Sequence, residues 1–263
     1  MSDVSILIPN FRTPILTKLC LRSLRKYTDT SRCKVLVIDN GSGDGEESLE
    51  YLRSLKWITL LENHPDPNLP PAVIHSLSMD KLLHAAETEF ILSMHTDTII
   101  KHSGWLNYLL EHIQKPGIAG VGSWKLEKQS LLKKTGKRLE DLFRERVRNF
   151  FTNTKKRIEE KYLRSHCALY RRELVIEYTK GFYDGMETGH SIHNMLHRNG
   201  FGMLFLPESE LGKYMVHINH ATMILNPEIA GKKTSRPQAR KKIAGFLGRD
   251  CWDNILMDTS LDL

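Results

Sequence analysis

The sequence predicts an α/β protein with a mostly parallel central sheet flanked by helices. Two observations predict this class: short runs of branched apolar residues alternate with segments of helical apolar period, and several of the runs end in polar or glycine-rich loops. The 263 residues are 40% hydrophobic and 26% charged, which suits one globular domain with appended elements. No apolar run approaches the roughly eighteen residues that a membrane span needs, so we expect a soluble or peripheral protein.

Three strand and helix units open the chain. The first helix is predicted from Pro14 with Thr13 as its N-cap, and the second strand ends at Asp39 before a glycine-rich loop. The strands are VSILIPN, KVLVIDN and WITLLEN, and the helices that follow them are TPILTKLCLRSLRKY, EESLEYLRSL and PPAVIHSLSMDKLLHAAE. Repeated units of this kind predict parallel strands joined by helices.

The middle of the chain contains a fourth unit and then changes character. A strand is predicted over EFILSMHTDTII, a helix over GWLNYLLEHIQK and a short strand over GIAGVGSW. After Trp124 the apolar residues become sparse, and residues 125–164 contain about fourteen basic and six acidic residues. We expect residues 125–165 to form a basic, helical insertion outside the core.

The last part of the chain returns to alternating elements before a basic tail. CALYRREL has strand character, METGHSIHNMLHRNG reads as a helix, and YMVHINHAT reads as a strand or turn. Residues 231–249 contain about seven basic and no acidic residues. We therefore expect a domain over residues 1–229 and a basic C-terminal extension over residues 230–263.

The charge and the cysteines limit the classes of partner and compartment. The net charge of +7 and the pI of about 9.2 suit polyanions such as nucleic acid, anionic lipid headgroups or phosphate-bearing substrates, although solvated helix faces are an equal alternative. The four cysteines lack CxxC spacing, so neither a disulfide framework nor a zinc knuckle is indicated. The start MSDVSILIPN lacks the features of a secretory signal, and we expect a cytoplasmic location.

Polar residues stand where the predicted strands end, which is where ligands bind in such sheets. Asp39 could accept hydrogen bonds from a nucleobase or ribose, while the glycines after it let the backbone come close; an ordinary Asp-Gly turn is the alternative. The GxxxxGK[ST] pattern of a P-loop is absent. Asp97 is a hard oxygen ligand for a divalent cation, and His95, two residues earlier, is expected on the same strand face.

Three further side chains are candidates for chemistry. His217 and His220 in VHINH could ligate a divalent transition-type ion, although lone histidines are more often core or surface residues. Glu187 in DGMETGHS could act as a general base toward a hydroxyl, or simply cap the following helix.

The order of these segments resembles the family 2 glycosyltransferases, of the bacterial polysaccharide type, that have the GT-A fold. The resemblance covers roughly residues 4–220 with a gap across the basic insertion. It is carried by VSILIPNFR, VLVIDNGSGDG, FILSMHTDT, ALYRREL, METGHSIHNMLHRNG and VHINH in that order. It implies a Rossmann-like sheet and a metal-dependent enzyme, with Mn²⁺ or Mg²⁺, that transfers a sugar with inversion from a UDP- or dTDP-sugar to a hydroxyl of a saccharide or lipid-linked acceptor.

The resemblance also implies roles for individual residues. HTD lies where the family has its DxD motif, so Asp97 matches the metal-binding aspartate and His95 replaces the first aspartate. His217 resembles the late histidine that completes the metal site, with His220 as the alternative, and Glu187 lies where relatives carry the catalytic base. The implied nucleotide-binding residues are Pro9, Asn10, Arg12, Asp39, Gly41, His95 and Thr96.

Two other functions remain open at this level. The missing first aspartate also suits a GT-A-like nucleotidyltransferase or a non-catalytic subunit that binds nucleotide sugars. A nucleic-acid partner is not expected, because no aromatic-rich RNA-binding signature accompanies the basic patches. The basic insertion and extension are better explained by contact with the anionic inner face of the cell membrane, where a lipid-linked acceptor is found.

Overall fold

The computed structural model describes residues 3–124, 126, 161–185, 188–227 and 237–263. Most of the predicted insertion at residues 125–165 and the candidate base Glu187 therefore lie outside the described residues. The start of the predicted C-terminal extension, residues 230–236, also lies outside them.

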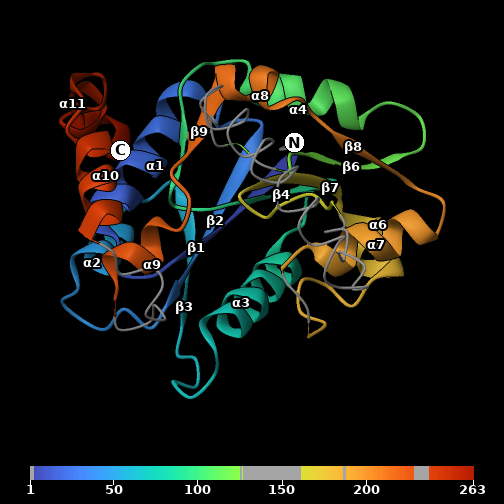
Figure 1. Ribbon diagram of the computed structural model, residues 1–263, viewed down its shortest axis with the longest axis horizontal. Coiled ribbons are helices and arrows are strands. Elements are labelled where there is room, and N and C mark those ends of the chain that lie inside the picture. The colour runs from blue at the N-terminus through green and yellow to red at the C-terminus, as the bar shows by residue number, and fades with distance from the viewer. Residues whose placement is uncertain (1–2, 125, 127–160, 186–187, 228–236) are drawn as a thin grey trace, which may run out of the picture.

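Two sheets contain the strands of the described part of the chain (Figure 1). The strands are β1 (Val4–Asn10), β2 (Cys33–Asn40), β3 (Ile58–Asn63), β4 (Phe90–Met94), β5 (Thr98–Ile100), β6 (Ile118–Gly122), β7 (Cys167–Arg171), β8 (Gly202–Phe205) and β9 (Met215–His217). The large sheet has the order β3-β2-β1-β4-β7-β6-β8, and the small sheet pairs β5 with β9. In the large sheet only β7 runs antiparallel to its neighbours, β4 and β6, so the predicted α/β class with a mostly parallel sheet is confirmed.

Helices cover both faces of the large sheet (Figure 1). They are α1 (Pro14–Tyr27), α2 (Glu47–Ser54), α3 (Pro71–Ala85), α4 (Trp105–Ile113), α6 (Arg172–Tyr178), α7 (His190–Arg198), α8 (Glu208–Tyr214), α9 (Ala221–Leu225), α10 (Pro237–Leu247) and α11 (Asp250–Leu256), with a 3-10 turn η1 (Thr259–Asp262). Successive side chains of a strand point to opposite faces, so Ile6 packs with α1 and α4 while Leu7 packs with α3 and α7. Both faces of β1 are therefore buried, as its unbroken apolar run predicts.

The segment FILSMHTDTII is not one strand, which corrects our prediction. β4 ends at Met94 and β5 begins at Thr98, with a turn between them in which the Thr98 amide donates to the His95 carbonyl over 3.0 Å. β5 leaves the large sheet at this turn and pairs with β9 instead. His95 and Asp97 therefore approach each other through a turn, and our argument that they share a strand face is wrong.

The prediction of a strand over CALYRREL also needs correction. β7 ends at Arg171, opposite Phe90 at the start of β4, and α6 begins at the next residue. The Arg172 amide still donates to the Glu89 carbonyl at 3.0 Å, but the chain is helical from Arg172 onward, and this helix buries Val175 against the sheet.

The described C-terminal residues pack back onto the domain beside α1 (Figure 1). Trp252 and Ile255 of α11 are buried in the same apolar core as α1. Asp262 accepts hydrogen bonds from the Arg22 guanidinium, with Nε to Oδ1 at 2.9 Å, and from the Tyr51 hydroxyl at 2.7 Å. In the part of the chain that the structure describes, no helix has the length and apolar character needed to span a membrane.

Candidate functional site

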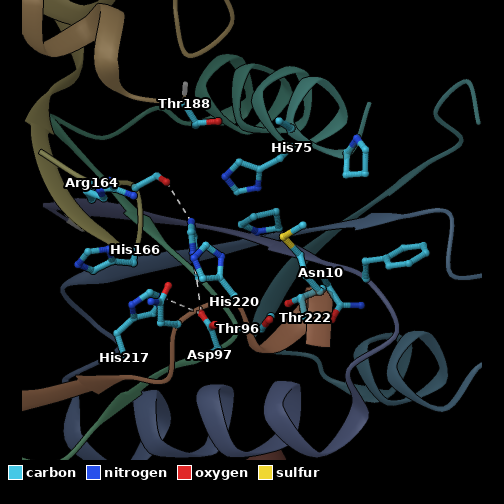
Figure 2. A pocket seen from close by; sticks show the side chains of 18 of the residues that line it. Asn10, His75, Thr96, Asp97, Arg164, His166, Thr188, His217, His220 and Thr222 are labelled. Atoms are coloured by element: carbon cyan, nitrogen blue, oxygen red, sulfur yellow. Dashed lines mark hydrogen bonds and ion pairs between the residues drawn. The ribbon is translucent and has the colours of Figure 1, made fainter. Parts of the chain in front are cut away.

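A cavity of about 640 Å³ lies where β1, β2 and β4 reach their carboxyl ends. Residues from both halves of the chain line it, from Pro9 after β1 to Met223 in α9. Figure 2 shows the side chains that point into it, with His75 descending from α3 and Asp97 and His217 on the opposite wall. This is the position at which open α/β sheets bind ligands.

Asp97 and His217 are brought together by the small sheet. The pairing of β5 with β9 places His217 opposite Thr98, so that it lies beside Asp97. The Ile218 amide donates to the Asp97 carbonyl at 2.9 Å, and the Ala221 amide donates to Asp97 Oδ2 at 3.1 Å. As a result His217 Nε2 lies 3.1 Å from Asp97 Oδ1 (Figure 2).

His95 adds a third donor to this pair. Its Nδ1 lies 3.8 Å from Asp97 Oδ1, and its Nε2 is 3.0 Å from the hydroxyl of Ser165. One donor atom from each of His95, Asp97 and His217 lies within 4.8 Å of the others. The three residues therefore form a cluster that could hold a metal ion, with two imidazoles and one carboxylate.

The polar atoms of this cluster fit a bound cation. Asp97 Oδ1 and both ring nitrogens of His217 are buried, and apart from the 3.1 Å contact between Oδ1 and Nε2, which lacks hydrogen-bond geometry, they have no partner among the described residues. Burial opposes ionisation of Asp97, but the adjacent His217 imidazole outweighs it and holds the pKa of the carboxyl well below its usual range. Buried polar atoms without partners are costly, so a divalent cation held by Asp97, His217 and His95 accounts for this arrangement.

Two more imidazoles, which the sequence reasoning missed, surround the cluster. The ring of His166 stacks on that of His217 at 4.4 Å between centroids, and the ring of His75 meets that of His95 edge-on at 5.1 Å. Burial lowers the pKa of His75 to about 4 and that of His95 to about 3, and it lowers the pKa of His166 well below its usual value. These rings are therefore neutral near pH 7. His75 gave no sequence signal within its apolar helix, whereas His166 directly precedes a predicted strand.

The residues at the ends of β1 and β2 mostly bind one another. Asp39 Oδ1 accepts from Asn10 Nδ2 at 2.8 Å and from the Ser42 hydroxyl at 2.6 Å, and Oδ2 accepts from the Ser42 amide at 2.9 Å. The Arg12 guanidinium donates to the Ser42 carbonyl at 3.0 Å. This network holds Asn10 in place at the wall of the cavity.

The predicted site residues divide into three groups by position. Arg12, Asp39 and Gly41 lie near the cavity but not in its lining, and Glu187 lies outside the described residues. His220 lines the cavity at the start of α9 but does not belong to the cluster of three donors. The predicted residues that line the cavity are Pro9, Asn10, His95, Thr96, Asp97, His217 and His220.

The chain has detectable similarity to known proteins. Residues 70–179 match the family described as glycosyl transferase family 2. This match includes the HTD turn and β7. No curated protein matches the chain.

Several solved structures share the fold. A mannosyltransferase from Pyrobaculum calidifontis in complex with GDP-Man and Mn²⁺ has a TM-score of 0.55 and 16% identity over 78% of this chain and 55% of its own. The chain thus spans about half of that enzyme's length. TarS from S. aureus, residues 1–349 with UDP-GlcNAc, has a TM-score of 0.54 and 16% identity, covering 97% of this chain and 70% of its own.

A third solved structure also shares the fold. It is the glucosyl-3-phosphoglycerate synthase from Mycobacterium tuberculosis with Mn²⁺, UDP and phosphoglyceric acid, which has a TM-score of 0.51 and 16% identity. The alignment covers 94% of this chain and 79% of that one. At this level of identity the likeness establishes the fold.

Proposed function

We propose that this chain is a family 2 glycosyltransferase with the GT-A fold and that it transfers a sugar with inversion from a nucleoside diphosphate donor to a hydroxyl of a saccharide or lipid-linked acceptor. The observation that carries the proposal is the contact of Asp97 with His217 beside His95 at the end of β4. His95 and Asp97 follow β4 whereas His217 ends β9, and the fold brings the three together in the cavity, where a donor diphosphate would reach them.

Different parts of the cavity have different proposed roles, according to the strand that they follow. Asn10 and Asn40 line the cavity at the ends of β1 and β2, where amide groups can bind a base or ribose. Asp97 and His217, with His95, would hold a divalent ion, which supplies positive charge to stabilise the leaving diphosphate. Two of the structural neighbours are complexes with Mn²⁺ and a nucleotide or nucleotide sugar, which supports a metal of this class.

Glu187 is the proposed general base. It would take the proton from the acceptor hydroxyl as that oxygen attacks the face of the sugar opposite the diphosphate. The next residue in the chain, Thr188, lines the cavity and its hydroxyl lies 2.6 Å from that of Ser76 on α3. The place of Thr188 in the cavity lining supports this assignment.

A nucleotide-sugar-binding subunit without transfer activity is the second candidate. The observation that favours it is the scarcity of carboxylates, since Asp97 is the one carboxylate among the described residues that line the cavity. An inactive binding module would keep metal-dependent nucleotide affinity but show no turnover. A nucleotidyltransferase of the same fold would instead release pyrophosphate from a nucleoside triphosphate.

The test is a transfer assay with a panel of donors. UDP-, dTDP- and GDP-sugars are incubated with Mn²⁺ or Mg²⁺, release of nucleoside diphosphate is measured, and the anomeric configuration of the product is read by NMR. We expect inverted product and a loss of turnover of at least about 100-fold in Asp97→Ala and in Glu187→Gln. Glu173→Gln, which neutralises an exposed carboxylate on α6, is the matched control.

Each result of this assay has a defined meaning. Turnover that is equal in the wild type and both variants contradicts the assigned roles. Metal-dependent nucleotide binding without any turnover favours the binding subunit.

The basic extension has a proposed role at the membrane. Residues 231–249 contain about seven basic and no acidic residues, and polybasic segments bind anionic lipid headgroups. We expect the protein to sediment with vesicles that contain phosphatidylglycerol at low salt and to be released at high salt. Failure to sediment at any salt concentration contradicts this role.

A further inference from the structure

Arg164 lies over two aromatic rings that line the cavity. Its guanidinium carbon lies 4.5 Å from the ring centroid of Trp124 and 5.3 Å from that of Tyr162. The two rings meet nearly perpendicular, at 78° with centroids 5.1 Å apart, so they form a corner for the guanidinium. All three residues line the cavity. Cation–π contacts of this kind orient an arginine but leave its N–H groups available.

The backbone holds Arg164 firmly in this position. Its amide donates to the Ser123 carbonyl at 3.0 Å, just beyond β6, and its carbonyl accepts from the Cys167 amide at 3.2 Å, at the start of β7. The neighbouring Ser165 contacts His95 through its hydroxyl at 3.0 Å. Arg164 is therefore linked, through its neighbour Ser165, to the cluster of His95, Asp97 and His217. Figure 2 shows Arg164 above His166 on the same wall of the cavity.

The guanidinium lacks an anionic partner in the described part of the chain. Its Nε is buried and has no hydrogen-bond partner among the described residues, and no carboxylate there forms an ion pair with it. Arg164 is half-buried and has the two ring contacts, but a buried N–H group without a hydrogen-bond partner is unfavourable, because it loses hydration without replacing it. A carboxylate or phosphate in the cavity would satisfy it, since the planar guanidinium matches both groups in two-point hydrogen bonding.

The sheet order places Arg164 on the side of the cluster away from β1 and β2. The residues proposed for the nucleoside follow β1 and β2, whereas Asp97 follows β4 and Arg164 precedes β7. In the order β2-β1-β4-β7, the start of β7 lies about 10 Å from the end of β1, since strands are about 4.8 Å apart. A donor that extends from β1 to the cluster at β4 would present its sugar toward Arg164, and the acceptor would lie beyond.

We propose that Arg164 binds an anionic group, a phosphate or a carboxylate, on the acceptor. This inference rests on the proposed glycosyltransferase function and adds the chemical class of the acceptor. The corner made by Trp124 and Tyr162 orients the guanidinium. The positive charge of the guanidinium then favours an anionic acceptor over a neutral sugar.

Calorimetric titration with methyl phosphate tests the inference in two arms. In the first arm methyl phosphate is titrated into protein that is saturated with Mn²⁺ and with the tightest-binding of UDP, dTDP and GDP, so that the donor phosphate site is filled. In the second arm the same nucleotide is titrated into protein with Mn²⁺ alone. We expect Arg164→Gln to weaken methyl phosphate binding at least tenfold and nucleotide binding less than twofold, with Arg164→Lys intermediate in the first arm.

The controls separate this role from general effects. Arg198→Gln removes the same charge from an exposed position at the end of α7, outside the cavity lining, and should change neither arm. Circular dichroism melting of each variant checks the fold. If Arg164→Gln does not fold, the comparison of wild type with Arg164→Lys in the two arms still tests the inference.

Other outcomes would overturn the inference. An equal loss in both arms would assign Arg164 to the donor diphosphate, and unchanged or undetectable methyl phosphate binding would remove the anion site altogether. If no nucleotide binds with Mn²⁺, the proposed function fails. Titration of methyl phosphate into the free protein and Arg164→Gln then still decides whether Arg164 binds an anion.

Discussion

Asp39 and Asp97 are both buried aspartates at strand ends, yet their carboxylates have opposite surroundings. Asp39 is 2% exposed and its two oxygens accept three hydrogen bonds from Asn10 and Ser42. Asp97 is 3% exposed, and its Oδ1 has no hydrogen-bond partner within the described residues. Burial therefore does not distinguish a structural carboxylate from a ligand-binding one; the partners of its oxygens do.

The two carboxylates differ because the residues around them come from different parts of the chain. Ser42 lies three residues after Asp39, and Asn10 lies directly opposite it in the pairing of β1 with β2. Asp97 instead faces His217, which the chain reaches only after three more strands of the large sheet. Hydrogen bonds from Asn10 and Ser42 satisfy both oxygens of Asp39, whereas in Asp97 only Oδ2 accepts a hydrogen bond and Oδ1 is left facing the imidazoles.

The substitution Asp97→Asn should produce the largest effect. It keeps the acceptor for the Ala221 amide but removes the negative charge that faces His217 and His95. We expect the affinity for Mn²⁺ to fall by more than about 100-fold, because even partners outside the direct ligands cost 10–100-fold. Isothermal titration with Mn²⁺ measures this, and Asp44→Asn in an exposed loop is the control. Equal affinities in variant and wild type would show that Asp97 is not a ligand.

The substitution Asp39→Asn should affect stability but not metal binding. Replacing one carboxylate oxygen by an amide disrupts part of the network with Asn10 and Ser42, at a cost of about 2 kcal/mol. The melting temperature should then fall by about 6 °C. Thermal denaturation checks this beside the Mn²⁺ titration, with Asp44→Asn again as the control. A loss of metal affinity without destabilisation would contradict the structural role of Asp39 and assign it to ligand binding instead.

The substitution His95→Asp should change the choice of metal. A second carboxylate beside Asp97 supplies the oxygen ligands that Mg²⁺ prefers, whereas imidazole favours transition-type ions. We expect the affinity for Mg²⁺ relative to Mn²⁺ to rise about tenfold. The metal-free variant should also melt below the wild type, because two carboxylates repel each other in the absence of a cation. Parallel titrations with both ions decide the matter, and an unchanged ratio excludes His95 as a ligand.

Asp262 extends the comparison to a carboxylate that is satisfied but lies near the surface, and it should give the smallest effect. Burial opposes its ionisation, but hydrogen bonds from Arg22 and Tyr51 outweigh this and lower its pKa. Because the folded-state pKa lies below the value of about 3.9 in the unfolded chain, the stabilisation is present above about pH 4. It is lost as the pH falls through the folded-state pKa.

The measurement for Asp262 is urea denaturation of the wild type and Asp262→Asn at two pH values. We expect the variant to be less stable by about 1 kcal/mol at pH 7, a modest value because the pair is partly exposed. The difference should shrink at pH 3, where the wild-type carboxyl also begins to be protonated. A difference that is the same at both pH values would mean that the charge of Asp262 does not stabilise the fold.

Much of the fold could be predicted because its signals are local. The buried runs of β1 and β2, Pro14 at the start of α1 and the alternation of strands with helices follow from neighbouring residues. The two errors in secondary structure, at HTD and after Arg171, arose where one strand ends and the next element begins. Polar residues stand at both points and apolar residues resume after them, so the hydrophobic pattern alone does not show that the strand has ended.

The candidate site was predictable only in part for the same reason. Asp97 and His217 are recognisable from their place in an ordered series of segments, and the structure puts their donor atoms 3.1 Å apart. His75, His166 and Arg164 belong to no motif in the sequence analysis, and their place in the cavity depends on which helix and which loop cover the end of β4.

The sequence by itself determined the α/β class, the strand ends where ligands bind and the aspartate most suited to a cation, because each depends on residues close together in the chain. Only the tertiary structure decided which imidazoles join Asp97, that Asp39 is already satisfied, and that Arg164 is stacked without an anionic partner among the described residues. These features depend on distances between segments up to about 120 residues apart. Such distances are set by the order and pairing of strands, which periodicity and composition do not specify.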